Sequence, residues 1–305
     1  MVKEVSVVLG SYNRYELLQK TIASIRQEVI GLNHEIIVID GGSTDGALEW
    51  LLAQKDIITI VQHNRGEWLG KPIVRRSWGY FMNLGFKIAQ GSYVCMISDD
   101  AVFIPGSLKR GIKLCDDKRV AGYKIGGAAF YYRDWPRETL YHINYALGDK
   151  LYVNHGLYLK QALHDVDYID EDTYQFYNAD GDLCLKIWAA GYEIIPATES
   201  YVEHYQYANV SIRITNEALY KQDFACYLKK WTGIYYDSYE HNVGRQETKA
   251  MVDEYKSFQA FELENKKVQQ QHPHLFKPAS LFKKIKQRTR WRVQSGLRKI
   301  LKFFR

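Results

Sequence analysis

The sequence predicts an α/β protein with a mostly parallel, doubly wound sheet and helices on both faces. Two observations support this fold class. Apolar, β-branched runs alternate with segments of helical periodicity over the first hundred residues. The runs are apolar on both faces, as is typical of strands buried inside a parallel sheet. The strands are predicted at residues 5–13, 34–46, 57–63 and 92–100.

Helices are predicted between these strands, at residues 14–28, 47–54 and 77–90. The first helix carries apolar side chains at helical spacing, namely Leu17, Leu18, Ile22 and Ile25. Ser43 is a good N-cap for the second helix. Gly91 suits the C-terminal cap of the third helix.

The regular alternation ends after residue 108. A helix is predicted over 107–117, followed by a Tyr-rich region over 123–178 that we expect to be irregular. Further helices are predicted at residues 180–194, 216–231 and 245–270. The segment 272–278 (HPHLFKP) is interpreted as a hinge.

The composition is that of an ordinary folded protein, with 46% hydrophobic and 25% charged residues. The four cysteines are scattered in apolar contexts without CxxC spacing, which indicates buried free thiols in a reducing compartment. The chain starts directly with a predicted strand, and no stretch approaches the roughly 20 apolar residues that span a bilayer. We therefore expect neither a signal peptide nor a transmembrane helix.

Polar residues follow three of the predicted strands, in the segments 11–13, 40–43 and 98–100. Ligands bind beyond the carboxyl ends of strands in such sheets, so these loops are expected to meet at one edge. Asp99 and Asp100 are adjacent there, and burying two like charges costs several kcal/mol unless something neutralises them. Either the pair belongs to a simple turn, or a divalent cation and a phosphate complete the site.

Several nucleotide-binding classes are disfavoured by the first loop, LGSYNR, at residues 9–14. It contains one glycine, whereas a dinucleotide dehydrogenase shows GxGxxG after the first strand. No P-loop is present. A nucleotidyltransferase would also need a Gly-rich first loop to hold a triphosphate, so its absence counts against that class.

Four segments together resemble the successive motifs of the family 2 glycosyltransferases, which have the GT-A fold. They are VSVVLGSYNRYELLQKTIASI, EIIVIDGGSTDG, ISDDAVFIPGSL and YNADGDLCLKIWAAGY, and the resemblance covers residues 4–205. It implies a metal-dependent, inverting transfer of sugar from a nucleoside-diphosphate sugar, with a UDP-sugar as the default donor. The implied acceptor is a hydroxyl of a glycan or of a lipid-linked glycan.

The resemblance also implies a domain organisation. Residues 1–215 would form the GT-A catalytic domain, with a sugar-nucleotide-binding half (1–108) and an acceptor-binding half (109–215). A helical extension (216–271) and a basic amphipathic tail (272–305) would follow.

By resemblance, the first loop contacts the nucleotide base and ribose through Ser11, Tyr12, Asn13 and Arg14. The family's usual proline is missing from this loop, so its placement is expected to differ slightly. Asp40 matches the acid that hydrogen-bonds the base. A strand-end Asx turn is the alternative for Asp40.

The family's Asp-x-Asp metal motif aligns with Ser98, Asp99 and Asp100. Asp100 takes the position that ligates Mn²⁺ or Mg²⁺, and Asp99 is expected to contact the ribose or to support the metal ligands. His204 matches a histidine that returns to the metal or the diphosphate, with an ordinary loop histidine as the alternative. Arg76 is expected to approach the diphosphate, although such arginines are usually just solvated.

The acceptor half carries the implied catalytic base, Asp180, which removes the proton of the acceptor hydroxyl. An N-cap of the helix that follows is the alternative for Asp180. Asp182 is expected to be a structural or acceptor-side residue. Trp135 and Tyr132 are candidates for stacking on an acceptor sugar, and a place in the core is equally compatible with them.

The basic tail explains the net charge. Residues 280–305 hold ten basic residues and no acid, so with +6 for the whole chain the first 279 residues sum to −4. Apolar residues recur at helical spacing in the tail, which is typical of a helix that lies on an anionic membrane surface. We therefore expect a cytoplasmic protein bound peripherally to the inner face of the cell membrane. Packing on the body or on a partner chain is the alternative, and the acidic body argues against nucleic acid.

Two other functions remain open at this point. A non-catalytic relative that binds a sugar nucleotide or glycan is one, because Ser98 and Ala179 stand where the family usually has acids. A nucleotidyltransferase is the other, and it would consume a nucleoside triphosphate.

Overall fold

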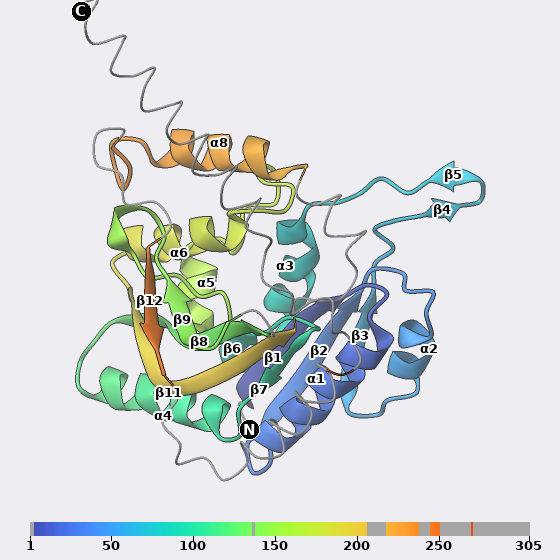
Figure 1. Ribbon diagram of the computed structural model, residues 1–305, viewed down its shortest axis with the longest axis horizontal. Helices are drawn as coiled ribbons and strands as arrows, with labels where there is room; N and C mark the ends of the chain where they lie inside the picture. The colour runs from blue at the N-terminus through green and yellow to red at the C-terminus, as the bar shows by residue number, and fades with distance from the viewer. Residues whose placement is uncertain (1–2, 136–137, 206–217, 238–244, 251–269, 271–305) are drawn as a thin grey trace, which may run out of the picture. The chain divides into compact units, whose positions relative to one another are not determined.

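The computed structural model describes residues 3–135, 138–205, 218–237, 245–250 and 270 (Figure 1). The chain divides into two compact units, residues 1–258 and 259–305, and the fold below is that of the first. The expected hinge (272–278) and the basic tail (280–305) lie outside the described residues.

The N-terminal half is a parallel sheet, as the sequence predicts. Its strands lie in the order β6-β1-β2-β3, and all three pairings between them are parallel. The bounds of these strands and of the helices between them are β1 Lys3–Ser11, α1 Tyr15–Glu28, β2 His34–Asp40, α2 Ala47–Leu52, β3 Ile57–Val61, α3 Trp78–Ile88 and β6 Gly91–Met96. A small hairpin of β4 (Glu67–Trp68) and β5 (Lys71–Pro72) interrupts the connection from β3 to α3.

The region 123–178 is not irregular, and this expectation was wrong. It contains the long strand β8 and the shorter β9 and β10, which extend the sheet by antiparallel pairing. Every residue from 125 to 133 in β8 is buried, so the strand has no polar face and no period of two for the sequence to show. The bounds are β8 Ile125–Trp135, β9 Tyr141–Asn144, η1 Leu147–Asp149, β10 Gly156–Leu159 and α5 Lys160–Asp165.

Three further strands, β7, β11 and β12, complete the described sheet. β11 (Glu193–Tyr205) runs parallel to β8 and antiparallel to the short β7 (Ala101–Phe103). β12 (Gln246–Lys249) pairs with β9, so the helix expected from residue 245 is wrong at these positions. The segment forms a strand because it pairs with β9, about a hundred residues earlier in the chain. The local sequence therefore does not predict this strand.

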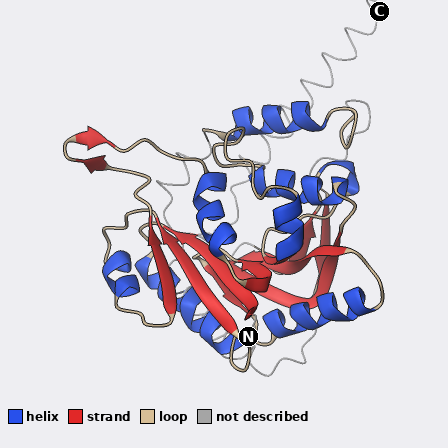
Figure 2. Ribbon diagram, turned by 180° about the vertical axis from the view of Figure 1, so that it is seen from behind, coloured by secondary structure: helices blue, strands red, loops and turns tan. Residues whose placement is uncertain are grey.

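Helices cover both faces of the sheet (Figures 1 and 2). On one face α1, α2 and α4 (Ser107–Val120) share one buried apolar cluster with the odd-numbered residues of β1, which are Val5, Val7 and Leu9. On the other face α3 approaches β1 so closely that a Cβ at Gly85 would lie 2.5 Å from Cγ1 of Val8. The helices α5 and α6 (Ala179–Ala189) also lie on this face, while α8 (Tyr220–Trp231) follows later in the chain. The predicted fold class is confirmed.

This topology brings distant segments to one edge of the sheet. β1, β2 and β6 are parallel, so the loops after them lie together at their carboxyl ends. Pairing of β11 with β7 sets His204 opposite Ala101, and the amide of Tyr205 donates to the carbonyl of Asp100 at 2.7 Å. Among the residues that the structure describes, no helix is long and apolar enough to cross a bilayer.

One buried carboxylate links two helices on the same face. Gly106 precedes α4 with φ 83° and has no side chain to cap the helix. The carboxylate of Glu28, at the end of α1, accepts from the amides of Gly106 at 2.5 Å and Leu108 at 2.8 Å. Glu28 therefore supplies the cap from another helix.

Replacement of Glu28 with Ala is expected to lower the free energy of unfolding by about 1–3 kcal/mol, because two amides lose a buried acceptor. Urea denaturation followed by circular dichroism measures this loss. Glu16→Ala, at an exposed position on the same helix, is the control and should change stability by less than about 0.5 kcal/mol. Equal losses in the two variants would contradict the capping role.

Candidate active site

The adjacent carboxylates of Asp99 and Asp100 are both buried and share one cation. Nη1 of Arg14 lies 2.7 Å from Oδ1 of Asp99 and 2.6 Å from Oδ2 of Asp100. Arg14 follows β1 and precedes α1, so the parallel pairing of β1 with β6 places its side chain across the two acids. Burial, with the charge of Asp100, raises the pKa of Asp99 above its ordinary value against the opposing charge of Arg14.

His204 supplies a second positive group, on the other side of Asp100. Its Nε2 lies 3.2 Å from Oδ1 of Asp100, and its Nδ1 lies 2.8 Å from Oδ1 of Asp134. Burial acts to lower the pKa of His204, but Asp100 and Asp134 outweigh it and raise the pKa to about 9. Burial likewise acts to raise the pKa of Asp100, and the charges of His204 and Arg14 hold it below its ordinary range.

A group of aromatic and histidine rings lies beside His204. The ring of Tyr132 lies 4.3 Å from that of His142, 5.0 Å from that of His155 and 6.1 Å from that of His204, measured between centroids. His155 is buried, and neither of its ring nitrogens has a hydrogen-bond partner among the described residues. Burial, followed by the charge of His204, lowers the pKa of His155 to about 3, so this ring is neutral.

The first loop and the loop after β2 are tied to each other. Oδ1 of Asn13 accepts from the amide of Thr44, and the amide of Asn13 donates to Oγ of Ser43. Asp40 is fully buried, and it accepts from the amides of Gly42 and Ser43 and from Oγ of Ser43. These hydrogen bonds form the Asx turn that was the alternative interpretation of Asp40. Contact of Asp40 with a nucleotide base stays a prediction.

The other expected nucleotide ligands lie along the same edge. Ser11 ends β1 with a buried hydroxyl, and the half-buried ring of Tyr12 has the guanidinium of Arg65 at 5.5 Å from its centroid. Ser98 is half-buried between β6 and β7. Arg76 is exposed and lies 5.2 Å from the ring centroid of Tyr80, so the structure does not bring its side chain to the two acids.

Asp180 lies in the first turn of α6. The helix begins at Ala179 and the residue before it is Asn178, in the left-handed conformation with φ 64°, so the alternative of Asp180 as the N-cap is wrong. The side chain of Asp180 is half-buried and accepts from the amide of Gly181 at 2.8 Å. Burial raises its pKa above the ordinary value. Burial raises the pKa of Tyr132 well above its ordinary value, and the charges of Asp134 and Asp180 add to this effect.

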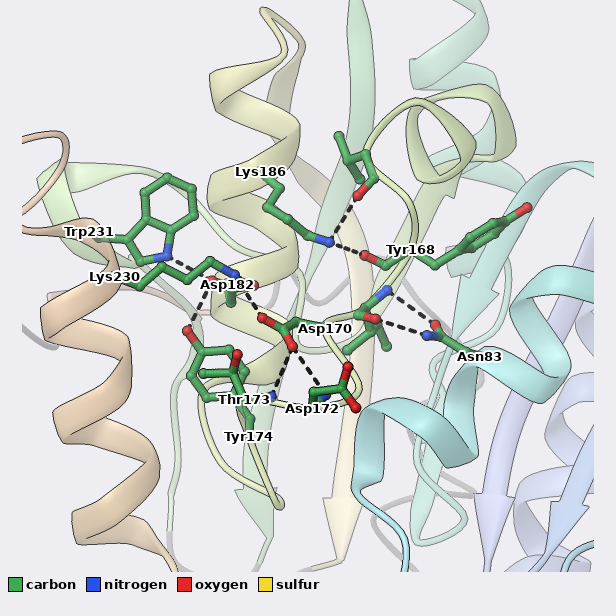
Figure 3. Close-up of polar contacts among 12 residues, drawn as sticks. Asn83, Tyr168, Asp170, Asp172, Thr173, Tyr174, Asp182, Lys186, Lys230 and Trp231 are labelled. Carbon is green, nitrogen blue, oxygen red and sulfur yellow. Dashed lines mark hydrogen bonds and ion pairs between the residues drawn. The ribbon is translucent and has the colours of Figure 1, made fainter.

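The structure places two of the three expected acceptor residues in buried positions. Asp182 is fully buried and accepts from Tyr174, Lys230 and Trp231, which is the structural alternative that its position in the sequence left open (Figure 3). Tyr132 is buried beside histidine rings, as the alternative of a place in the core expected. Contact of either residue with an acceptor stays a prediction. Trp135 ends β8, and its side chain lies outside the described structure.

The family resemblance leads us to expect Mn²⁺ or Mg²⁺ at this site. The carboxylate oxygen of Asp100 and the ring nitrogen of His204 are suitable ligands for such an ion. Oδ1 of Asp100 is buried, and its contact is the ion pair with Nε2 of His204 at 3.2 Å. Asp134 holds the opposite nitrogen of His204 and directs Nε2 toward Asp100, as in metal-binding histidines. No described cluster of three or more His, Cys, Asp or Glu side chains is arranged for a metal. The site fits a cation that takes its remaining ligands from the substrate.

Replacement of Arg14 with Met is expected to lower the free energy of unfolding by about 3 kcal/mol, because it leaves two buried acids with less compensation. Mn²⁺ should raise the melting temperature of Arg14→Met more than that of the unmodified protein, since the ion can replace the lost charge. Thermal unfolding with and without MnCl₂ measures both effects. Arg26→Met, which breaks an exposed pair with Asp56, is the control. Equal shifts with Mn²⁺ would contradict a cation site at Asp99 and Asp100.

Known proteins resemble this chain over part of its length. It is 27% identical to dolichol-phosphate mannosyltransferase of Pyrococcus furiosus over 138 residues, which are 42% of this chain and 37% of that protein. It is 27% identical to undecaprenyl-phosphate 4-deoxy-4-formamido-L-arabinose transferase of Serratia proteamaculans over 132 residues, 41% of this chain and 36% of that protein. The chain thus spans little more than a third of the length of these relatives.

Solved structures share the fold. Mannosyltransferase PcManGT from Pyrobaculum calidifontis, in complex with GDP-Man and Mn²⁺, aligns with a TM-score of 0.51 and 18% identity over 74% of this chain and 64% of that one. S. aureus TarS aligns with a TM-score of 0.51 and 16% identity over 76% of this chain and 44% of that one. At this identity the likeness concerns the fold alone, and it confirms the GT-A architecture.

The family match itself is broader than half of the chain. Residues 6–165 match the model of Glycosyl transferase family 2. The matched segment contains Arg14 and both acids that it bridges, whereas Asp180 and His204 lie beyond its end. On this match, and on the fold that carries these residues to one edge of a parallel sheet, the chain belongs to glycosyl transferase family 2.

Proposed function

We propose that this chain is an inverting glycosyltransferase that moves a sugar from a nucleoside-diphosphate sugar to a glycan or lipid-linked acceptor. The observation that supports it most is the junction of Arg14, Asp99, Asp100 and His204 at the carboxyl edge of the sheet. Two cationic side chains and a candidate cation site lie together there, where a diphosphate develops negative charge as it leaves.

The donor diphosphate would be held at this junction. Asp100 and His204 would hold Mn²⁺ or Mg²⁺, which when bound neutralises charge on the leaving diphosphate. The pKa of His204 is about 9 in the protein alone, so coordination through Nε2 requires loss of its proton. Arg14 would compensate the charge of Asp99 in this arrangement.

Asp180 is proposed as the general base. The acceptor oxygen attacks the anomeric carbon as the bond from that carbon to the diphosphate oxygen breaks, and the hydroxyl proton passes to the carboxylate of Asp180. Attack from the face opposite the diphosphate inverts the anomeric centre. Burial raises the pKa of Asp180, and a base closer to neutral pH takes the proton more effectively.

We propose the chemical class of the donor and of the acceptor. A UDP-sugar is the default donor, and a GDP-sugar is a second candidate because a protein of the same fold was solved in complex with GDP-Man and Mn²⁺. The names of both curated relatives contain a polyprenyl phosphate, so a lipid-linked acceptor is proposed. Attachment to a membrane through residues 280–305 stays a prediction, since the tail lies outside the described residues.

Hydrolysis of a panel of UDP-, GDP- and dTDP-sugars is expected to release one nucleoside diphosphate slowly, only with Mn²⁺ or Mg²⁺ present. EDTA and Asp100→Ala should each reduce the release by about 100-fold or more, because the leaving group loses its charge stabilisation. A coupled assay for the free diphosphate measures the rate. The control Asp117→Ala, at an exposed position on α4, should leave the rate unchanged.

Two results would contradict parts of this proposal. Release that EDTA and Asp100→Ala do not affect would exclude the metal site. Calorimetric binding of a donor by the unmodified protein, without turnover in the presence of glycan and polyprenyl acceptors, would favour the non-catalytic relative.

Asp180→Asn tests the base. With a hydroxyl acceptor, transfer should fall by about 10²–10⁴-fold, because the amide cannot take the proton. Binding of the nucleoside diphosphate, measured by calorimetry, should change less than about twofold. With a polyprenyl phosphate acceptor, which is already ionised, the same variant should retain most of its activity. The control is Asp172→Asn, an exposed acid in the preceding loop.

A further inference from the structure

Helix α8 lies outside the segment that the family model matches, yet it binds the loop that leads to Asp180. The carboxylate of Asp223, in the first turn of α8, is 1% exposed. Its Oδ1 accepts from the amide of Gln175 at 3.0 Å, and its Oδ2 accepts from the amides of Phe176 and Tyr177 at 2.8 Å each. Three consecutive amides of the loop therefore depend on one side chain of α8.

The last turn of α8 holds the other end of the same segment. Asp182 accepts from Nε1 of Trp231 at 2.8 Å and from Nζ of Lys230 at 2.9 Å. Lys230 also lies 2.9 Å from Asp170, and Tyr174 donates to Asp182 at 3.0 Å. Figure 3 shows these side chains converging between α6 and α8.

The segment between these two attachments carries the proposed base. It runs from Tyr174 to Asp182, and its carbonyl at Gln175 also accepts from the amide of Trp78 on α3 at 2.9 Å. Asn178 adopts φ 64°, which lets the loop turn directly into α6. The carboxylate of Asp180 accepts from the amide of its neighbour Gly181, so the path of the backbone decides where this carboxylate lies.

We propose that Asp223 is a positioning residue, whose carboxylate fixes the loop 175–177 and through it the place of Asp180. The inference rests on the proposed function, since it concerns the base of that reaction. Hydrogen bonds from amides to an ionised acceptor are among the stronger ones in proteins. A misplacement of about 1 Å in a catalytic group costs about 100-fold in rate, so loss of this acceptor should affect turnover more than binding.

The charge of Asp223 also acts on Arg75, so an effect through the loop 175–177 has to be distinguished from an effect through Arg75. Burial and the charge of Arg65 lower the pKa of Arg75, and the charge of Asp223 opposes them. Arg75 precedes α3, within the segment that the family model matches. If Asp223 worked through Arg75, its loss would weaken binding of the nucleotide.

The experiment compares Asp223→Asn, Arg75→Gln and Asp56→Asn in the full chain. Hydrogen exchange of the amides at 175–177, calorimetric binding of UDP and GDP with Mn²⁺, and kcat and KM on the donor of the panel are measured for each. Asp56→Asn, at an exposed surface pair, is the matched control and should equal the unmodified protein in all three.

For Asp223→Asn we expect exchange at 175–177 to rise about tenfold, the dissociation constant of the nucleotide to change less than about twofold, and kcat to fall about 10–100-fold. Unchanged exchange at these amides would overturn the inference, whether or not the protein turns over a donor. Faster exchange with unchanged kcat would also overturn it. If Asp223→Asn instead weakened nucleotide binding as much as Arg75→Gln does, the inference would be wrong and Asp223 would act through Arg75. Absence of turnover in the unmodified protein counts against the proposed function, while exchange still decides the attachment of the loop.

Discussion

The charge balance around two adjacent buried acids is the constraint on which the rest of this structure depends. Asp99 and Asp100 follow a buried strand, and two uncompensated carboxylates at that depth would cost several kcal/mol. Arg14 compensates both from the loop after β1, and His204 compensates Asp100 from β11. Both arrangements need the sheet to be complete, because the three segments come from different parts of the chain.

Three buried acids of this protein connect elements of the fold. Glu28, Asp182 and Asp223 each accept two or three hydrogen bonds from neighbouring elements and hold helices or loops in place. Asp100 and Asp180 are different. Asp100 is paired with the cationic groups of Arg14 and His204, and the half-buried Asp180 accepts from its neighbouring amide. The proposed chemistry therefore falls on acids that do not hold a separate helix or loop in place.

Much of the candidate site could be predicted from the sequence. The polar loops after β1, β2 and β6 follow apolar runs, and parallel topology requires such loops to meet. The resemblance led us to expect His204 at the metal or the diphosphate. The structure sets this histidine beside Asp100, and its contact with either group stays a prediction. The contacts of Asp134, His155 and Asp223 were not predicted. Asp134 lies opposite His204 on the neighbouring strand β8, and His155 precedes the short strand β10. Such contacts between distant segments leave no local pattern in the sequence.

The sequence by itself determined the parallel half of the sheet, its flanking helices and the edge at which the polar loops collect. Those features arise from periodicity and from turn residues, which act over a few neighbouring positions. Tertiary structure alone decided the antiparallel half, where β8 is buried on both faces, and the strand β12, which forms by pairing with β9. It also decided that Arg14 bridges two acids and that Asp182 holds α8. The physical reason is the same in each case: these outcomes depend on charges and hydrogen-bond partners that lie far away in the chain and meet only when the sheet is assembled.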